Sequence, residues 1–334
     1  MYNANIMIEK IRYRNYKVLR DCELPLGGFT LIVGANGSGK TTAMEALLGI
    51  FNAPTIYYDS LVTVGENDPV KLEVFLDRSV GNGILEMSWT KALGRGEYKL
   101  VKFPDGGAEA RAFRYLQSFR LFSLHAPSIA SPVNLTPHMV LEPDGGNLAG
   151  VLDTMRDKHP ERFERLNEEL ARWFPEFDRI LFDTPRTGER IFLLRKAAGK
   201  HPIPATALSQ GTLLALTILA VAYLHEPPSV VCFEEPDRGV HPRLLRNVHD
   251  ALYRLSYPES FGESRPPVQV VATTHSPYML DQFKDNLDEV VIAQKTEDNV
   301  RFERLSDLPN VEEIMAGSHL GEVWYSGVLG GVPD

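Results

Sequence analysis

The stretch that decides the fold is LIVGANGSGKTTAMEALLGI, residues 31–50. Within it, residues 34–41 are GANGSGKT and fit the phosphate-binding pattern G-x-x-x-x-G-K-[ST]. The apolar residues 29–33 supply the strand that should precede such a loop, and residues 42–51 supply the helix that should follow it. Because motif and context agree, a phosphate-binding loop is favoured over an ordinary glycine-rich turn.

The spacing of the glycines explains how such a loop binds a chain of phosphates. Gly34, Gly37 and Gly39 let the backbone turn without Cβ clashes, so that successive N–H groups point at phosphate oxygens. A helix that begins near Gly39 adds its positive N-terminal end, Lys40 can reach the β- and γ-phosphates, and the Thr41 hydroxyl can bind Mg²⁺. We therefore expect ATP or GTP with Mg²⁺ at a site formed by these residues and by Asn36, Ser38 and Thr42.

Composition indicates a soluble globular protein of the cytoplasm. The chain has 334 residues, of which 43% are hydrophobic and 24% are charged, an ordinary globular composition. No apolar run approaches about eighteen residues, so we expect no membrane insertion, and the charged first residues do not fit a signal peptide. Cys22 and Cys232 form no C-x-x-C pair, so we expect both to be buried rather than bridged or bound to zinc.

The net charge limits the kind of surface that could bind nucleic acid. A net charge of -9 and a pI of about 5.6 argue against a surface that is basic all over, but they leave room for a local basic patch. The densest cluster of cations near the N-terminus consists of Lys10, Arg12, Arg14, Lys17 and Arg20. A solvated strand face is the favoured interpretation of this cluster, and a nucleic-acid contact is the alternative.

The first half of the chain predicts an antiparallel β subdomain followed by a helical lobe. Residues 6–16 alternate apolar and polar side chains, which is typical of a half-buried strand, and residues 22–26 are its expected partner. Glycine-containing turns separate three further strands, which predicts a β-meander at 70–77, 84–90 and 98–103. Helices are then expected at 109–118, 148–158 and 160–173, with an irregular linker at 126–146 and a strand pair at 179–183 and 190–195.

The last third of the chain alternates helices with apolar strands, as a covered and largely parallel sheet requires. The expected helices are 212–224 and 243–255, the apolar strands are 229–233 and 268–273, and an edge hairpin at 287–293 and 300–305 precedes a helix at 319–329. We expect one domain over 1–334, in which a core of 1–52 and 190–334 carries the β-meander and helical lobe as an insert at 53–189.

Polar side chains follow both apolar strands of the last third. Glu234 and Glu235 come directly after the first strand, where one carboxylate can support Mg²⁺ and its neighbour can orient and deprotonate an attacking water. A surface pair before a proline turn is the alternative. His275 ends the second strand. A single histidine is usually structural, but one at the same sheet edge as the phosphate loop is a candidate sensor of the γ-phosphate.

The order of these motifs resembles one family of ATPases. Residues 208–212, LSQGT, resemble the signature motif of ABC-type ATPases, which lies upstream of the carboxylate strand. The phosphate loop, S-x-G, E-E-P-D-x-G-x-H-P and T-H-S-P together resemble the RecF/SMC/OLD branch, particularly its small stand-alone RecF-like ATPases. The resemblance covers residues 6–52 and about 190–330. It implies an α/β P-loop NTPase fold: an ABC-type core with a mixed sheet, an antiparallel β subdomain and a helical lobe.

The resemblance also implies roles for individual residues. Two copies would face each other head to tail, so that Ser209 and Gly211 of one copy contact the γ-phosphate bound to the other. Lys40 and Thr41 would bind phosphate and Mg²⁺, and Asp237 would lie in a loop that spans the dimer. Glu234, in place of the more usual aspartate, would support Mg²⁺, Glu235 would be the catalytic base, and His275 the switch. Gln117 is the one candidate for a glutamine loop.

The length of chain between the motifs narrows the function. Residues 42–207 show no sustained heptad pattern, so a coiled-coil arm is not expected. About sixty residues follow His275 without an acidic metal cluster, so a nuclease partner is expected on another chain. The leading hypothesis is an ATP-hydrolysing homodimeric switch that acts on DNA in repair or in defence against foreign DNA, with a separate effector. The alternatives are the nucleotide-binding subunit of a membrane transporter and an ATP sensor that recruits a non-nuclease effector.

Overall fold

The chain divides into two compact units, which we describe separately. The computed structural model describes residues 6–52, 57–92, 96–295, 299–309, 311 and 319–329. The first unit comprises Met1–Leu121, Pro228–Phe233 and Ser256–Asp334, and the second comprises Phe122–Pro227 and Glu234–Leu255. The expected single domain with an insert at 53–189 stays a prediction.

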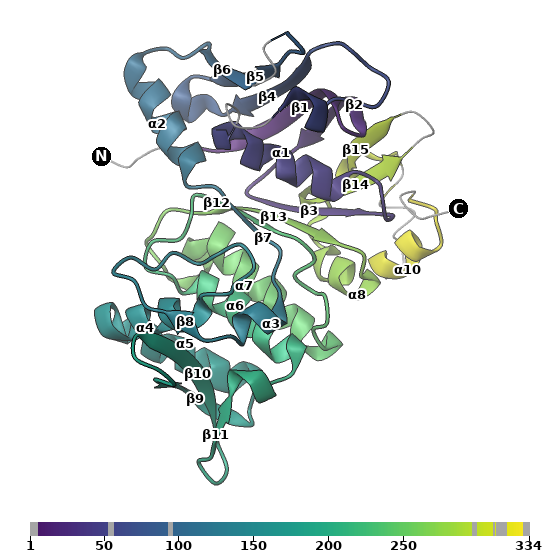
Figure 1. The fold of residues 1–334 in the computed structure, drawn as a ribbon. Coiled ribbons are helices and arrows are strands. Elements are labelled where there is room, and N and C mark those ends of the chain that lie inside the picture. Colours follow the sequence, from purple (N-terminus) through teal and green to yellow (C-terminus); the bar gives the residue numbers. More distant parts are fainter. Residues whose placement is uncertain are drawn as a thin grey trace. The chain divides into compact units, whose positions relative to one another are not determined.

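A six-stranded mixed sheet is the centre of the first unit (Figure 1), with the strand order β15-β14-β3-β13-β12-β7. Strands β14, β3, β13 and β12 run parallel, and β15 pairs antiparallel with β14 at one edge. Every residue of β3, β12 and β13 is buried, which explains why these strands are continuous apolar runs. The strands are β3 (Phe29–Gly34), β7 (Arg120–Phe122), β12 (Val230–Phe233), β13 (Gln269–Thr274), β14 (Val290–Lys295) and β15 (Val300–Arg304). The predictions of a largely parallel sheet and an edge hairpin are confirmed.

The first unit also contains a five-stranded antiparallel sheet, which confirms the predicted strand pair and β-meander. Its order is β2-β1-β4-β5-β6, and β4 and β5 alternate buried and half-buried residues because one face lies on the core. The strands are β1 (Ile8–Tyr16), β2 (Leu19–Pro25), β4 (Val70–Leu76), β5 (Ile84–Trp89) and β6 (Gly96–Val101). Helices α1 (Lys40–Asn52) and α2 (Gly106–Gln117) contribute apolar side chains to this core, and the Tyr13 hydroxyl donates to the Ala43 carbonyl at 3.0 Å.

The first unit buries the polar side chain of Gln269 and the thiols of both cysteines. The Gln269 side chain bridges strands, because its Oε1 accepts from the Ile8 N–H at 3.0 Å and its Nε2 donates to the carbonyls of Ile8 and Gly27 at 2.7 and 2.9 Å. These bonds satisfy backbone groups where the two sheets meet. Cys22 and Cys232 are buried as predicted, and burial raises the pKa of both thiols, that of Cys22 to about 12.

The second unit is built around helix α6 (Gln210–Ala222), in which every residue from Thr212 onward is buried. A helix that is apolar on all sides fits such a central position. Around it are α4 (Leu148–Lys158), α5 (Pro160–Trp173), α7 (Leu245–Ser256) and the strands β8 (Val133–Asn134), β9 (Phe177–Asp183), β10 (Glu189–Lys196) and β11 (Pro202–Pro204). Strand β10 pairs with β8, β9 and β11.

Some predicted elements differ from those observed. The expected irregular linker at 126–146 contains helix α3 (Ala126–Ile129), with a proline in its first turn, and strand β8, which forms by pairing with β10. The helix expected at 319–329 is shorter, α10 (Leu320–Tyr325), and a short helix α8 (Pro277–Leu280) was not predicted. None of the helices in the described part of the chain has both the length and the apolar character needed to span a bilayer.

Candidate nucleotide site

The phosphate loop lies between β3, which ends at Gly34, and α1, which begins at Lys40. Gly37 and Gly39 have φ angles of 74° and 88°, a left-handed conformation that favours glycine. At Gly34 the reason is space, because a Cβ there would lie 2.4 Å from the Ala293 carbonyl oxygen. The motif therefore needs glycine for two reasons, the backbone conformation at Gly37 and Gly39 and the lack of space at Gly34.

Lys40 places a positive charge inside this loop. Its Nζ donates to the carbonyl oxygens of Gly34 and Ala35 at 2.9 and 2.8 Å, and the residue is only 6% exposed. Asn36 and Gly37 are exposed at the tip of the loop, and Thr41 is exposed in the first turn of α1. A fixed cation and the N-terminus of a thirteen-residue helix thus meet at an accessible loop, which is the arrangement that binds phosphate.

His275 follows the strand beside the phosphate-loop strand. Strands β13 and β3 run parallel in a register that pairs Thr274 with Val33, so His275 and Gly34 come next at the same edge of the sheet. His275 is half-buried, and the next residue, Ser276, accepts a hydrogen bond from the Met279 N–H at 3.3 Å to begin α8. The first unit therefore brings His275 to the edge that carries the phosphate loop.

Glu235 is held in a strained backbone conformation in the second unit. Its φ angle is 46°, in the left-handed region that residues other than glycine rarely adopt. The Glu235 carbonyl accepts from the Arg238 N–H at 2.9 Å, and the preceding Glu234 N–H donates to the Phe122 carbonyl at 2.8 Å. Such strain costs on the order of 1–3 kcal/mol and is concentrated at functional sites.

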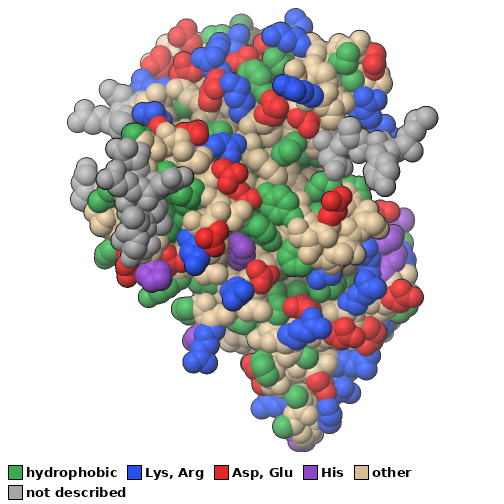
Figure 2. Space-filling model, turned by 180° about the vertical axis from the view of Figure 1, so that it is seen from behind, with side chains coloured by type: hydrophobic (Ala, Val, Ile, Leu, Met, Phe, Trp, Pro, Cys, Tyr) green, Lys and Arg blue, Asp and Glu red, His purple; other side chains and the backbone are tan. Residues whose placement is uncertain are grey.

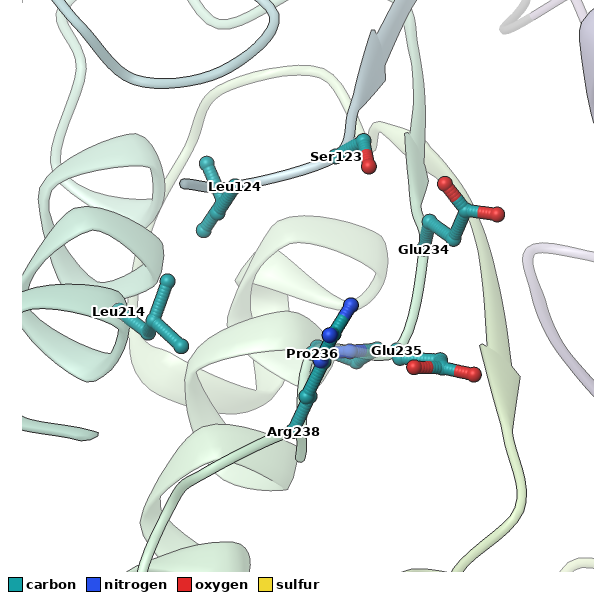
Figure 3. A pocket seen from close by; sticks show the side chains of 7 residues that line it. All are labelled: Ser123, Leu124, Leu214, Glu234, Glu235, Pro236 and Arg238. Atoms are coloured by element: carbon teal, nitrogen blue, oxygen red, sulfur yellow. The ribbon is translucent and has the colours of Figure 1, made fainter. Parts of the chain in front are cut away.

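The two carboxylates line a pocket of about 190 Å³ (Figure 3). In Figure 3, Leu124 and Leu214 lie on one side of the pocket, and Glu234 and Glu235 lie on the other. The full lining is Ser123, Leu124, Leu214, Glu234, Glu235, Pro236 and Arg238. The pocket therefore has one apolar and one acidic side.

The signature residues pack against the acidic loop within the second unit. The Ser209 Oγ accepts from the Thr212 N–H at 3.1 Å and so caps α6, while Ser209 itself is exposed. A Cβ on Gly211 would lie 2.4 Å from the carbonyl oxygen of Gly239, which belongs to the turn that Asp237 begins. The structure thus brings Ser209, Gly211 and the Asp237 loop together, and only glycine fits at 211.

The predicted site residues are distributed over both units. The first unit holds the phosphate loop and His275, and the second holds Ser209, Gly211, Glu234, Glu235 and Asp237. Their action on one nucleotide stays a prediction. Among the described residues there is no cluster of three or more His, Cys, Asp or Glu side chains that could hold a metal. The Thr41 hydroxyl beside the phosphate loop is an oxygen donor of the kind that Mg²⁺ takes when it arrives with phosphate oxygens and keeps water ligands. A role for the Glu234 carboxylate at the same ion stays a prediction.

Two polar residues of the pocket, Ser123 and Arg238, are not among the residues predicted from the sequence, and one predicted candidate lies elsewhere. Gln117 is the exposed last residue of α2 in the first unit and is not part of the pocket lining. Ser123 lines the pocket instead, directly after the short strand β7, which carried no strand signal of its own. Arg238 lies inside the E-E-P-D-x-G-x-H-P motif at the first of its two variable positions, and this proximity could have marked it.

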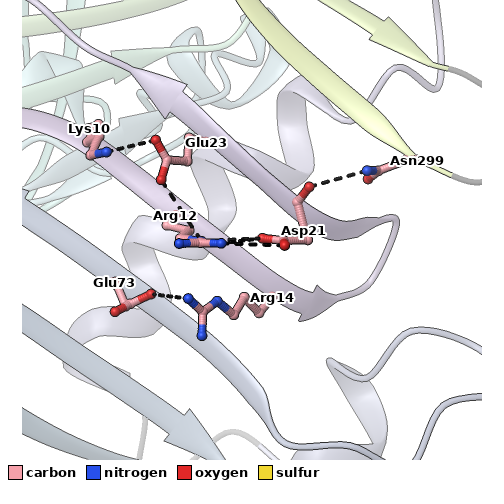
Figure 4. A network of polar contacts seen from close by, with 7 residues as sticks. All are labelled: Lys10, Arg12, Arg14, Asp21, Glu23, Glu73 and Asn299. Carbon is pink, nitrogen blue, oxygen red and sulfur yellow. Dashed lines mark hydrogen bonds and ion pairs between the residues drawn. The ribbon is translucent and has the colours of Figure 1, made fainter.

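The basic cluster of the first strands is paired with carboxylates (Figure 4). Each of its five cations lies within ion-pair distance of an Asp or Glu: the pairs are Lys10–Glu23, Arg12–Asp21, Arg14–Glu73, Lys17–Glu45 and Arg20–Glu66. Figure 4 shows the first three of these pairs. These exposed pairs add little stability, but they cancel the local positive charge. The structure therefore supports a solvated strand face. On the face seen in Figure 2, basic and acidic side chains are likewise interspersed.

Comparisons with known proteins identify relatives of both the sequence and the fold. A family model described as "AAA domain, putative AbiEii toxin, Type IV TA system" matches residues 102–281, and one described as "AAA ATPase domain" matches residues 7–83. The OLD nuclease of Thermus scotoductus is 23% identical over an alignment of 366 positions, gaps included, and the alignment covers 91% of this chain and 66% of that protein. The chain thus spans slightly less than two thirds of the length of this relative.

Two solved structures resemble the chain. The SMC head bound to the C-winged helix domain of ScpA has a TM-score of 0.65 at 17% identity and covers 92% of this chain and 99% of the SMC head. The recombination mediator protein RecF has a TM-score of 0.47 at 11% identity, and the match covers 89% of this chain and 98% of the RecF chain. The SMC head shows the same fold. Together with the sequence matches, it confirms the predicted resemblance to the RecF/SMC/OLD branch and the predicted ABC-type P-loop fold.

Proposed function

Because the chain belongs to the AAA-domain family whose model matches residues 102–281, we infer that it is an ATP-driven switch. ATP and Mg²⁺ bind at the phosphate loop, two copies close around the nucleotide, and hydrolysis releases them. One observation supports this most directly: Lys40 and the start of α1 provide a phosphate site, and His275 follows the strand paired with β3 at the same sheet edge.

The residues divide the chemistry between them. The Lys40 ammonium and the loop N–H groups neutralise the phosphates and the charge that develops as the γ-phosphate leaves. Glu235 orients the attacking water and accepts its proton, and His275 contacts the γ-phosphate. Mg²⁺, held through Thr41 and Glu234, supplies Lewis-acid stabilisation of the phosphate oxygens when bound. The strained backbone at Glu235 supports this role, since strain is retained where the geometry of a side chain matters.

The dimer is proposed to form through the signature surface. Ser209 and Gln210 are exposed at the start of α6, and the Asp237 loop packs against Gly211 beside them. An exposed helix start offers N–H groups to an anion, and the γ-phosphate bound to a second copy is the anion we propose. ATP would then join the two copies, because each completes the other's site.

Ser209→Asp tests this dimer without removing the helix cap. Aspartate caps a helix as well as serine does, but its carboxylate would repel a triphosphate from the partner. We expect wild-type protein to sediment as a dimer with Mg²⁺ and a slowly hydrolysed ATP analogue, and Ser209→Asp to stay monomeric while still binding the analogue.

Ser209→Asn is the matched control, because asparagine also caps the helix but carries no charge. It should dimerise like the wild type. If Ser209→Asp dimerises equally well, the signature surface does not meet the nucleotide. If the wild type itself stays monomeric with bound nucleotide, the switch model is wrong and the chain is a lone nucleotide binder.

We place the switch in the cytoplasm, in DNA repair or in defence against foreign DNA, with a separate effector chain. The relative from Thermus scotoductus is named as a nuclease, which supports a nuclease effector. The family description names a toxin, which supports the second candidate, an ATP sensor that recruits a non-nuclease effector. The transporter alternative has no such support, and the E-E-P-D-x-G-x-H-P and T-H-S-P motifs argue against it.

We expect the switch to bind DNA in a way that depends on ATP and on salt. We expect retention of duplex DNA with ATP at about 50 mM salt to fall on the order of a hundredfold or more by about 200 mM, because phosphate contacts release counterions. Arg12→Gln should leave retention unchanged, since Arg12 is already paired with Asp21. Filter binding measures this. The absence of any retention at low salt would remove DNA from the proposal.

A further inference from the structure

Helix α10 (Leu320–Tyr325) packs against the short helix α8 (Pro277–Leu280), which begins two residues after His275 (Figure 1). The closest approach is at Gly321, where a Cβ would lie 2.4 Å from the Pro277 carbonyl oxygen and 2.8 Å from its carbonyl carbon. Both are backbone atoms, which cannot swing aside as a flexible side chain can. Gly321 is therefore required for space at the first turn of α8.

A second contact fixes the same two helices. The Gly321 N–H donates to Oδ1 of Asp281 at 2.7 Å, and Asp281 caps the C-terminal end of α8. The apolar face of α10 is buried, with Leu320 at 0% and Trp324 at 5% exposure. The start of α10 thus contacts both ends of α8.

Hydrogen bonds hold the short segment between His275 and Pro277 in place. The Ser276 N–H donates to the Thr274 Oγ1 at 2.9 Å, and the Ser276 Oγ accepts from the Met279 N–H. These bonds tie the end of β13 to the first turn of α8, and His275 lies between them. A shift of the Pro277 peptide must therefore move Ser276 and, with it, His275.

We propose that Gly321 is a positioning residue for His275. The contact with the carbonyl group and Cβ of Pro277 sets where Pro277 lies. Because Pro277 is bonded to Ser276, which follows His275 directly, its position sets where the imidazole meets the γ-phosphate. The proposal rests on the proposed role of His275 in hydrolysis. Gly321 is not among the residues proposed to bind the nucleotide, so it should affect turnover and not ATP affinity.

Gly321→Ala separates these two quantities. The added methyl group would push the Pro277 carbonyl away, and a displacement of this kind lowers the rate on the order of ten- to a hundredfold. We expect that loss in kcat for ATP hydrolysis, with the equilibrium Kd for ATP within about twofold of wild type. The control is Gly106→Ala, also in the first turn of a helix, where a Cβ meets nothing within 4 Å. It should leave both quantities unchanged.

A double-mutant cycle tests whether Gly321 acts through His275. His275→Ala alone should slow hydrolysis, and adding Gly321→Ala should slow it no further, because the group being positioned is gone. Multiplicative losses, or a normal kcat in Gly321→Ala while His275→Ala is slow, would overturn the proposal for Gly321. A wild-type rate in His275→Ala would instead remove His275 from the proposed function, and the positioning role with it.

Asp281→Ala provides a second route if Gly321→Ala does not fold. It removes the acceptor of the Gly321 N–H without adding atoms. We expect a smaller loss of kcat in the same direction, which disappears in the His275→Ala background. An additive loss in that background would count against the positioning role.

Discussion

Lys40→Ala should abolish most nucleotide binding. The Lys40 ammonium is the buried cation of the loop, and its Nζ lies within 2.9 Å of two loop carbonyls. Losing one partner of a buried charge pair costs about 2–5 kcal/mol, so ATP affinity should fall by roughly thirtyfold to several thousandfold. Equilibrium titration with ATP and Mg²⁺ measures the change directly.

Two further variants show whether the loss of ATP affinity in Lys40→Ala comes from the missing charge or from a disturbed fold. Lys40→Arg keeps the charge but replaces a compact ammonium with a planar guanidinium, so we expect an affinity between those of wild type and Lys40→Ala. Lys91→Ala removes an exposed lysine whose Nζ contacts Asn67 and should leave ATP binding unchanged. An unchanged affinity in Lys40→Ala would refute the phosphate-loop assignment.

The phosphate loop was predictable because its signal is local. Strand, glycines, lysine and helix lie within about twenty consecutive residues, and the apolar runs that became β3, β12 and β13 are buried throughout. The same holds for α4 and α5, whose observed bounds match the predicted ones. Where a segment carries its own periodicity and end signals, tertiary structure has little to add.

Features that depend on distant partners were not predictable. Strand β8 has two residues and exists because it pairs with β10, far along the chain. The pairing of Arg12 with Asp21, and of Arg14 with Glu73, follows from the register of β1 against β2 and β4, which the sequence does not display. From the sequence alone, a DNA contact therefore stays open as the alternative for the basic cluster. The carboxylates of the neighbouring strands, which pair with these cations, favour the solvated strand face.

The site shows the same division between local and distant information. Glu235 was a candidate from its place after an apolar strand, but its left-handed backbone is visible only in the structure. Gly321 carried no motif at all, and its importance follows from the backbone of Pro277, forty-four positions earlier in the chain. Sequence patterns thus identified the residues expected to touch the nucleotide, while the residues that position them required the fold.

Glu235→Gln should keep ATP binding and lose most turnover. Glutamine has nearly the same shape as glutamate but cannot accept the proton of the attacking water. General-base catalysis contributes about 10²–10⁴-fold, so we expect steady-state phosphate release to fall by that order. Because the phosphate loop and signature surface are unchanged, the ATP-bound dimer should accumulate, which sedimentation with ATP and Mg²⁺ detects. Glu259→Gln, at an exposed glutamate, is the matched control and should behave as wild type.

Glu235→Gly distinguishes the carboxylate from the backbone that carries it. Glycine accepts a φ angle of 46° without strain, so this variant should unfold at a higher denaturant concentration than wild type and still lose turnover as Glu235→Gln does. A gain in stability with a loss of activity would indicate that the strained conformation is retained for its carboxylate. Turnover near the wild-type rate in either variant would show that Glu235 is not the base.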